Sequence, residues 1–166
     1  MAEPWLSGSI TGIHPALASV LYSFEQIKQD LRKWTEDLTD DQIWAAPHGL
    51  APVGFQLRHI AGSIDRLFCY AQGGQLSDKQ LAALKVEMTP GPAREQLLAE
   101  LESTLDRVGR QIRSIDPAAL PEPRFVGRQR LPTTLIGLLV HIAEHAQRHV
   151  GQAIITCKLL RGPAAL

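Results

Sequence analysis

The sequence predicts an all-α protein, a four-helix bundle with long connections and one or two short extra helices. Four separate stretches carry apolar residues at helical spacing, and each is long enough to bury one face against its neighbours. Breaks rich in glycine and proline separate these stretches, and no stretch alternates convincingly like a strand. The 166 residues, 45% of them hydrophobic and 20% charged, predict a single globular domain over residues 1–166.

The first expected helix begins at Pro15, because proline is favourable in the first turn of a helix. Its apolar stripe predicts an end between Thr35 and Leu38. Thr39 is then well placed to cap a short helix that ends at Ile43, and the two aspartates that follow Thr39 favour this helix start.

Glycine and proline breaks also separate the next two long helices. The second is expected from near Val53 to about Gln72, where two consecutive glycines end it. Residues 77–87 predict a short amphipathic helix. The third long helix is expected from about Ala93 to Ile115.

A long connection follows over residues 116–132, and its four prolines favour an irregular path, with a little extended structure at Phe125 and Val126 as the alternative. Either Thr133 or Thr134 can cap the fourth long helix. That helix is expected to run to about Leu160 and to end before the Gly-Pro pair at 162–163.

Composition excludes several classes of protein. Lys+Arg and Asp+Glu both number 17, so the chain lacks the basic surface that nucleic-acid binding requires, and Arg124, Arg128 and Arg130 are interpreted as a solvated loop. We expect no signal peptide and no membrane span, because the start lacks a basic region and the longest apolar stretch is too short. Cys69 and Cys157 form no CxxC motif, which predicts free thiols and a cytoplasmic location.

Three histidines recur every four residues in the stretch HIAEHAQRHVGQ, which spans residues 141–152. Residues four apart lie one turn above each other on a helix, so His141, His145 and His149 share a face. Leu138 lies on the same face, which predicts that the face points at the core. Such a row of imidazoles indicates either packed, hydrogen-bonded histidines or a metal site.

Helix geometry limits which histidines one ion can use. His141 and His149 are about 12 Å apart along a helix axis, so the pair must be either His141 with His145 or His145 with His149. A third ligand must come from elsewhere, and His59 on the second helix is the best candidate. Three histidines that leave one position open are typical of a reactive metal site.

One motif predicts a different arrangement. Residues His141 to His145 fit HxxEH, the inverted zinc-peptidase signature, in which Glu144 would be the general base. That signature needs a further carboxylate ligand downstream, and the sequence has no Asp or Glu after His145. Glu144 is therefore expected to face solvent or to support the site, and His14 and His48 are interpreted as ordinary exposed histidines.

Two stretches, FQLRHIAGSIDRL in the second helix and HIAEHAQRHVGQ in the fourth, resemble the DinB-like (DinB/YfiT) family of small bacterial four-helix-bundle proteins. The likeness covers nearly the whole chain. The family's metal triad is one histidine on the second helix and two, four residues apart, on the fourth, followed by a Gly-Gln step. The resemblance thus implies His59, His145 and His149 as ligands, with Gly151 and Gln152 as the trailing step.

The same resemblance implies a divalent ion, nickel or zinc, and a homodimer. Characterised relatives include transferases and isomerases that use bacillithiol, mycothiol or glutathione, so we expect a metal-dependent thiol transferase with Gln56 and Gln152 at the mouth of the site. Two alternatives stay open: a non-catalytic, stress-linked metal or small-ligand binding protein, and a metal-dependent hydrolase. His141 would lie beside the ligands, and Arg148 stands where many relatives have another histidine.

Three further interpretations concern residues near His59 and the cysteines. Gly62 is expected to let another helix approach closely. Asp65 and Arg66 are interpreted as a surface charge pair. The two cysteines lie on expected helices and are interpreted as buried hydrophobic residues.

Overall fold

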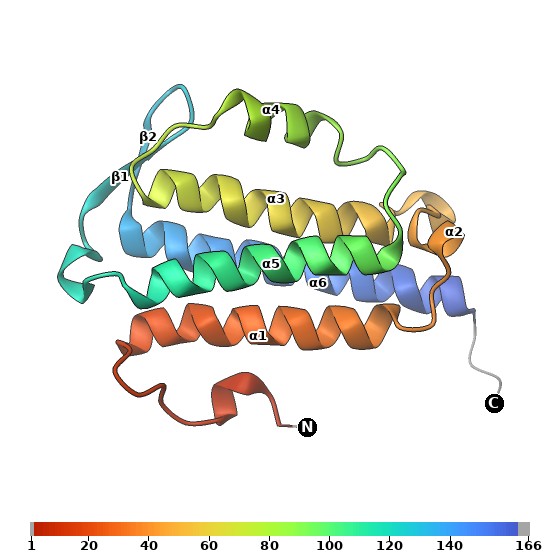
Figure 1. Ribbon diagram of the computed structural model, residues 1–166, viewed down its shortest axis with the longest axis horizontal. Coiled ribbons are helices and arrows are strands. Elements are labelled where there is room, and N and C mark those ends of the chain that lie inside the picture. The colour runs from red at the N-terminus through yellow and green to blue at the C-terminus, as the bar shows by residue number, and fades with distance from the viewer. Residues whose placement is uncertain (1, 163–166) are drawn as a thin grey trace.

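The computed structural model describes residues 2–162, and four long helices dominate it (Figure 1). The predicted all-α four-helix bundle is confirmed. The long helices are α1 (Pro15–Thr35), α3 (Val53–Ala71), α5 (Arg94–Arg113) and α6 (Leu135–Arg161). Two short helices, α2 (Asp40–Ile43) and α4 (Asp78–Lys85), lie in the connections, with 3-10 turns at Pro4–Leu6, Pro47–Gly49 and Pro117–Ala119.

Local sequence explains where the helices begin. Thr39 and Ser77 each cap a short helix, and a glutamine three residues later completes a capping box at both. Thr134, one of the two predicted caps, accepts a hydrogen bond from the backbone N–H of Gly137 and starts α6. The last helix ends at Arg161 as expected, while Pro163 lies outside the described residues.

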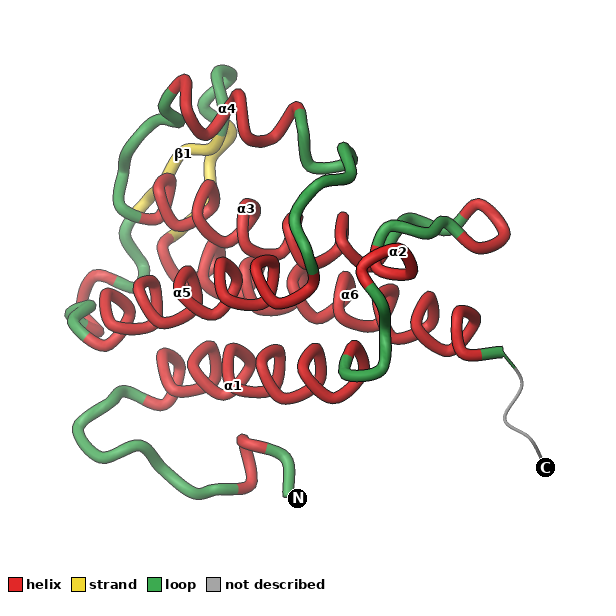
Figure 2. The backbone as a smooth tube through the Cα atoms, turned by 45° about the vertical axis from the view of Figure 1, so that its right-hand side comes forward, coloured by secondary structure: helices red, strands yellow, loops and turns green. Residues whose placement is uncertain are grey.

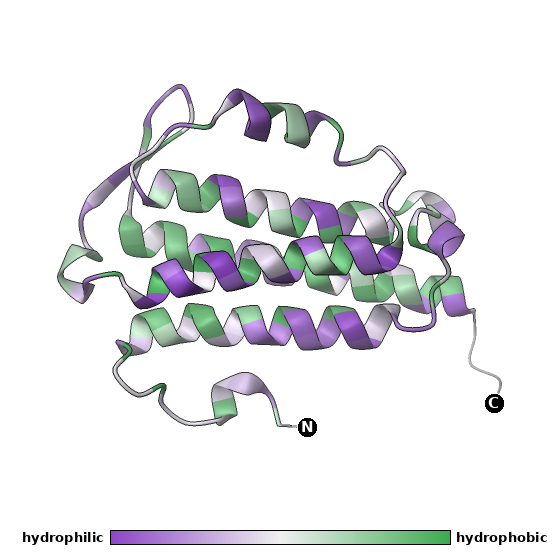
Figure 3. Ribbon diagram, viewed as in Figure 1, coloured by the Kyte–Doolittle hydropathy of each residue, from purple (hydrophilic) through white to green (hydrophobic). Residues whose placement is uncertain are grey.

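The four long helices form a ring in which each contacts two neighbours. Helix α3 packs against α5 and α6, and α1 packs against the same two helices on the opposite side. Helices α3 and α6 lie side by side and run in opposite directions (Figures 1 and 2). Each helix carries both apolar and polar residues (Figure 3), and the apolar ones fill one continuous core that includes Phe24, Leu57, Leu101 and Ile142.

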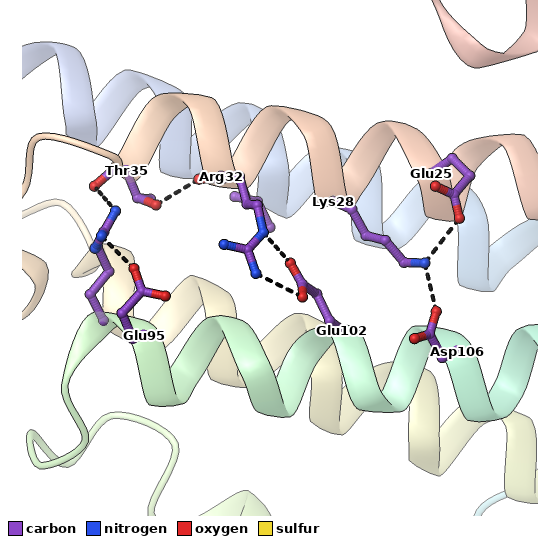
Figure 4. Close-up of polar contacts among 9 residues, drawn as sticks. Glu25, Lys28, Arg32, Thr35, Glu95, Glu102 and Asp106 are labelled. Atoms are coloured by element: carbon purple, nitrogen blue, oxygen red, sulfur yellow. Dashed lines mark hydrogen bonds and ion pairs between the residues drawn. The ribbon is translucent and has the colours of Figure 1, made fainter.

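Ion pairs join α1 to α5 on the outside of the bundle (Figure 4). Lys28 Nζ lies 2.6 Å from Asp106 Oδ1, and the Arg32 guanidinium donates to both oxygens of Glu102 at 2.6 and 2.9 Å. These pairs are partly exposed, so each stabilises the bundle by about 1 kcal/mol or less. The apolar core, rather than these pairs, holds α1 against α5.

The long connection before α6 contains an antiparallel hairpin, which corrects the prediction of an irregular path. Strand β1 (Pro123–Val126) pairs with β2 (Leu131–Thr134), so that Pro123 lies opposite Thr134. Positive φ angles at Gly127 (70°) and Arg130 (50°) close the turn. Prolines obscured these strands in the sequence, but a two-stranded sheet tolerates proline because each strand is an edge.

Helix α4 and the loops on either side of it lie beyond α3, on the side away from α1 (Figures 1 and 2). The predicted short helix is present, but it buries no residue. Among residues 2–162, no helix is long and apolar enough to cross a membrane.

Candidate metal centre

Three imidazoles converge where α3 and α6 pack together. His59 comes from α3 and His145 and His149 come from α6, and one ring nitrogen from each lies within 4.8 Å of the others. The Nε2 atoms of His59 and His145 are 3.1 Å apart. Two nitrogen ligands of a tetrahedral ion with bonds of about 2.0–2.1 Å lie about 3.3–3.4 Å apart. The three nitrogens could therefore hold a metal ion after only small shifts.

The rings gather at the edge of the core and not within it. The ring centroid of His149 lies 4.3 Å from that of His59 and 4.6 Å from that of His145. All three residues are partly exposed, and the His59 side chain retains 18% of its accessible surface. The cluster is therefore in partial contact with solvent.

Hydrogen bonds at Nδ1 orient two of the three rings. His59 Nδ1 lies 2.7 Å from Glu87 Oε2, and His149 Nδ1 lies 2.6 Å from Gln56 Oε1. Both partners are oxygen acceptors, so in this arrangement each Nδ1 donates its hydrogen and each Nε2 faces the cluster. Metal-binding histidines are supported in this way in known sites, so the residues present fit a metal ion.

Sequence reasoning missed Glu87, the carboxylate that supports His59. Its side chain is 5% exposed, and its other oxygen, Oε1, accepts a hydrogen bond from Arg66 Nη1 at 2.7 Å. The interpretation of Asp65 and Arg66 as a surface pair is therefore wrong, because Arg66 is buried and Asp65 pairs with Arg107 instead. Glu87 gave no signal of this role in the sequence, since it ends the short amphipathic helix predicted over residues 77–87 and no spacing relates it to His59.

Gly62 makes room for this ion pair. A Cβ at Gly62 would lie 2.6 Å from Glu87 Oε1 and 2.7 Å from Arg66 Nη1. The expectation that Gly62 admits another helix is corrected accordingly, because what approaches is a carboxylate and a guanidinium. The glycine was a usable sequence signal for a close approach, although it did not indicate which groups approach.

Comparison with known proteins assigns the chain to a family. Residues 23–153 match the DinB superfamily, which is most of the chain and includes all three histidines of the cluster. The chain belongs to the DinB superfamily. One solved structure with the same fold is YfiT from Bacillus subtilis, described as a probable metal-dependent hydrolase with an unusual four-helix bundle topology. The two chains share 18% identity over 90% of each, with a TM-score of 0.65, and no curated protein matches significantly.

Burial favours the neutral form of the two α6 imidazoles in the cluster of this DinB protein. Burial, followed by the neighbouring rings of His59 and His145, lowers the pKa of His149 to about 4. Burial also lowers the pKa of His145. Both rings are therefore uncharged at pH 7, which is the form that can bind a metal.

Glu87 is charged despite its burial. Burial alone would raise the pKa of its carboxyl group, but hydrogen bonds from His59 and Arg66 outweigh that effect and leave the pKa lowered. A carboxylate therefore faces Nδ1 of His59, and its negative charge makes the opposite nitrogen of the ring a stronger ligand.

His141 lies outside the cluster. Its side chain is 45% exposed, and its Nδ1 lies 2.7 Å from Glu144 Oε1, while its ring centroid is 5.4 Å from that of His145. The expectation that the whole histidine face points at the core is wrong at this position. Glu144 is also exposed and accepts a hydrogen bond from Arg148, as expected of a solvent-facing residue.

Of the other polar residues named from the sequence, two glutamines lie beside the cluster and two histidines lie away from it. Gln56 is 1% exposed, and its Nε2 donates to Gln152 Oε1 at 3.1 Å, so the two predicted mouth residues do lie beside the cluster. Gln152 is exposed, whereas Gln56 serves mainly to hold His149. The structure leaves His14 and His48 exposed and away from the cluster, as expected.

Proposed function

We propose that this DinB-superfamily protein is a metal-dependent enzyme in which His59, His145 and His149 bind one divalent ion, nickel or zinc. The observation that carries the proposal is the convergence of three imidazole nitrogens from two packed helices, two of them oriented by buried acceptors. Three histidines leave one position of a tetrahedral ion open, which is typical of reactive sites.

We propose further that the substrate is a small thiol, which the enzyme transfers to an electrophile. A divalent ion with an open position lowers the pKa of a bound thiol and so supplies a thiolate nucleophile. The exposed amide of Gln152, held by Gln56, can orient a polar part of the substrate. Phe55, whose ring stacks on His59 with centroids 5.3 Å apart, offers an apolar contact beside it.

Hydrolysis of an ester or amide is the second candidate. The description of YfiT as a probable metal-dependent hydrolase favours it, together with the shared fold. The two candidates differ in one requirement, because a hydrolase needs no thiol co-substrate.

The first experiment is elemental analysis of protein purified without a polyhistidine tag. We expect one equivalent of divalent metal per chain, lost in His59→Ala and retained in His141→Ala. His141 is a matched control because it lies one turn before His145 but outside the cluster. Loss of metal in His141→Ala and not in the other variant would favour the HxxEH arrangement and overturn this site.

The second experiment measures turnover with the metal-loaded protein. Consumption of 1-chloro-2,4-dinitrobenzene only when glutathione, bacillithiol or mycothiol is present would support thiol transfer. Cleavage of p-nitrophenyl acetate without thiol would favour hydrolysis instead. Metal binding with no turnover across both panels would indicate the non-catalytic binding protein, and turnover that survives chelation would exclude a metal-dependent enzyme.

We also propose a homodimer as the state in solution. Apolar side chains exposed along α6 support this, among them Val140, Ile155 and Leu159 at 54%, 56% and 44% exposure. Analytical ultracentrifugation of the wild-type protein tests it, and a single monomeric species at micromolar concentration would contradict it.

A further inference from the structure

The segment from Gln72 to Ala93, which contains α4, contacts the bundle with almost no buried side chains. Within these 22 residues, all of them described, Glu87 is the only buried side chain. Leu84, Val86 and Met88, which could have anchored the segment, are 42%, 49% and 55% exposed. The segment therefore has no fully buried apolar anchor of its own: Leu76 packs against the core only partly buried, and polar contacts attach the remainder at a few points.

A groove separates part of this segment from the helices beneath it. The groove has a volume of about 870 Å³ and lies between α4 with its following loop and the faces of α3 and α5. Ala61 and Gly62 line it from α3, Ala83 from α4 and Ala99 from α5. Sparse packing of this kind is typical of regions that open locally at low free energy.

The polar contacts fall at both ends of the groove. Gln80 Nε2 donates to Asp65 Oδ2 at 2.7 Å on the α4 side. The Arg58 guanidinium donates to the backbone carbonyls of Val86 and Thr89 at 2.7 and 2.8 Å. These contacts leave the loop 86–89 held against α3 mainly by hydrogen bonds, with Glu87 at its centre.

Glu87 differs from the other contacts because it is buried and charged. Its carboxylate needs donors on both oxygens to offset the loss of water. Arg66 always carries N–H groups that can donate a hydrogen bond to Oε1. His59 can donate to Oε2 only when its Nδ1 carries a proton. In the other neutral tautomer, the Nδ1 lone pair would face the carboxylate and repel it.

We propose that Glu87 is a positioning residue that links His59 to the docking of segment 72–93, so that metal binding and docking of this segment stabilise each other. The inference rests on the proposed metal site at His59, His145 and His149. An ion at Nε2 of His59 leaves the ring's proton on Nδ1, so the donor to Glu87 is always present. Because linkage is reciprocal, a docked Glu87 strengthens metal binding by the same factor.

The second supported ligand provides an internal comparison. Gln56, which orients His149, lies on α3 itself and is 1% exposed, so its position depends on the core alone. Glu87 accepts from Nδ1 of His59, and Gln56 accepts from Nδ1 of His149. Of these two acceptors, only Glu87 lies outside the four long helices. Only this support can therefore couple the metal site to segment 72–93.

Hydrogen–deuterium exchange with mass spectrometry tests the coupling in the full chain. Exchange in peptides covering residues 78–92 is compared in EDTA and in saturating Zn²⁺, while calorimetry gives the Zn²⁺ affinity. Removal of a carboxylate that supports a ligand typically costs 10–100-fold in metal affinity, and we expect a loss of that size in Glu87→Ala. Linkage then predicts that Zn²⁺ slows exchange in the wild-type segment by up to the same factor.

Two variants make the result specific. In Glu87→Ala, saturating Zn²⁺ should no longer slow exchange in residues 78–92. Gln56→Ala is the matched control, since it should weaken Zn²⁺ binding through His149 yet keep the slowing at saturation. Glu87→Gln retains an oxygen acceptor for Nδ1 of His59 but lacks the charge. Compared with Glu87→Ala, it should recover part of the Zn²⁺ affinity and part of the slowing of exchange.

The outcomes separate this inference from the proposed function. Wild-type protein that binds Zn²⁺ but shows unchanged exchange in residues 78–92 would overturn the coupling and leave the metal site standing. Wild-type protein that binds no metal would overturn both. The wild-type comparison needs no variant, so it decides the matter even if Glu87→Ala fails to fold.

Discussion

Nε2 of His59 lies 3.1 Å from Nε2 of His145, although 86 residues separate the two in the chain. The residue after each of them, Ile60 and Ala146, is fully buried with 0% exposure. Packing of α3 against α6 therefore sets the distance between the two rings. The buried neighbours of both histidines thus hold the three rings that could bind a metal ion.

Gly62→Ala tests whether this glycine exists to admit the buried ion pair. The added Cβ would lie 2.6 Å from Glu87 Oε1 and 2.7 Å from Arg66 Nη1, so the buried carboxylate and guanidinium must shift away from it. Alanine also favours the helix by about 1 kcal/mol relative to glycine, so a net loss of stability means that the displacement outweighs that gain. We expect urea denaturation to show a net loss of about 1–2 kcal/mol and calorimetry to show weaker metal binding.

Gly151→Ala is the control for this substitution. Gly151 lies in α6, is exposed, and has nothing within 4 Å of the position that a Cβ would take. Only the gain in helix propensity should remain, about 0.5–1 kcal/mol of added stability. Equal effects from the two alanines would contradict the role assigned to Gly62.

Arg66→Met tests the buried partner of Glu87. The substitution removes one of the two donors to a carboxylate that is 5% exposed. Leaving a buried charge without its partner typically costs about 3–5 kcal/mol, and we expect the lower end because His59 still donates. The double variant Arg66→Met/Glu87→Met should lose less than the single one, since it leaves no unpaired charge.

Arg148→Met provides the exposed counterpart. Arg148 pairs with Glu144 at 2.9 Å, but both side chains are largely in solvent. We expect no measurable change in the urea midpoint for this variant. If both methionine variants behaved alike, burial would not be what makes the Glu87–Arg66 pair important.

Stability of the metal-free protein should fall as the pH is lowered from about 6.5 to 4. Burial, followed by the neighbouring His59 and His145 rings, lowers the folded-state pKa of His149 to about 4, whereas an unfolded histidine titrates near 6.5. Between these values the unfolded chain binds more protons, so the free energy of unfolding decreases as protons are added. The decrease is at most about 1.4 kcal/mol per pH unit for one group, and smaller here because the ring is partly exposed.

Thermal melting in EDTA across this pH range measures the effect. His149→Gln removes the titrating group and should give a flatter dependence of the melting temperature on pH. Lowered folded-state pKa values for Glu87 and His145 also contribute, so some dependence will persist in the variant. An unchanged slope in His149→Gln would contradict the lowered pKa.

The two cysteines should react differently with alkylating reagents. Cys157 is fully buried, and burial raises the pKa of its thiol to about 11, so the reactive thiolate is scarce at pH 8. Cys69, expected to be buried, is instead only partly so, and its Sγ donates to the carbonyl of Gln75. Intact mass spectrometry after iodoacetamide should show at most one label on the native chain and two in guanidinium, and a native label on Cys157 would contradict its burial.

Features that depend on neighbours in the chain were predictable from the sequence. Pro15, Thr39 and Thr134 start helices because a first turn needs groups that satisfy or replace its free N–H donors. The spacing of His145 and His149 puts both rings on one face of α6 whatever the helix packs against. These are local effects, so the sequence by itself determined the bundle and put His141, His145 and His149 forward as candidate ligands on α6, with the choice of pair left open by helix spacing.

Only the tertiary structure decided what surrounds those rings. Glu87 reaches His59 across 28 residues and Gln56 reaches His149 across 93, and no periodic pattern links either pair. Whether His141 joins the cluster likewise depends on how α6 is rotated against α3, and packing of the core leaves it in solvent. Local spacing can put side chains on a face, but which groups meet there is decided by packing between segments that are distant in the chain.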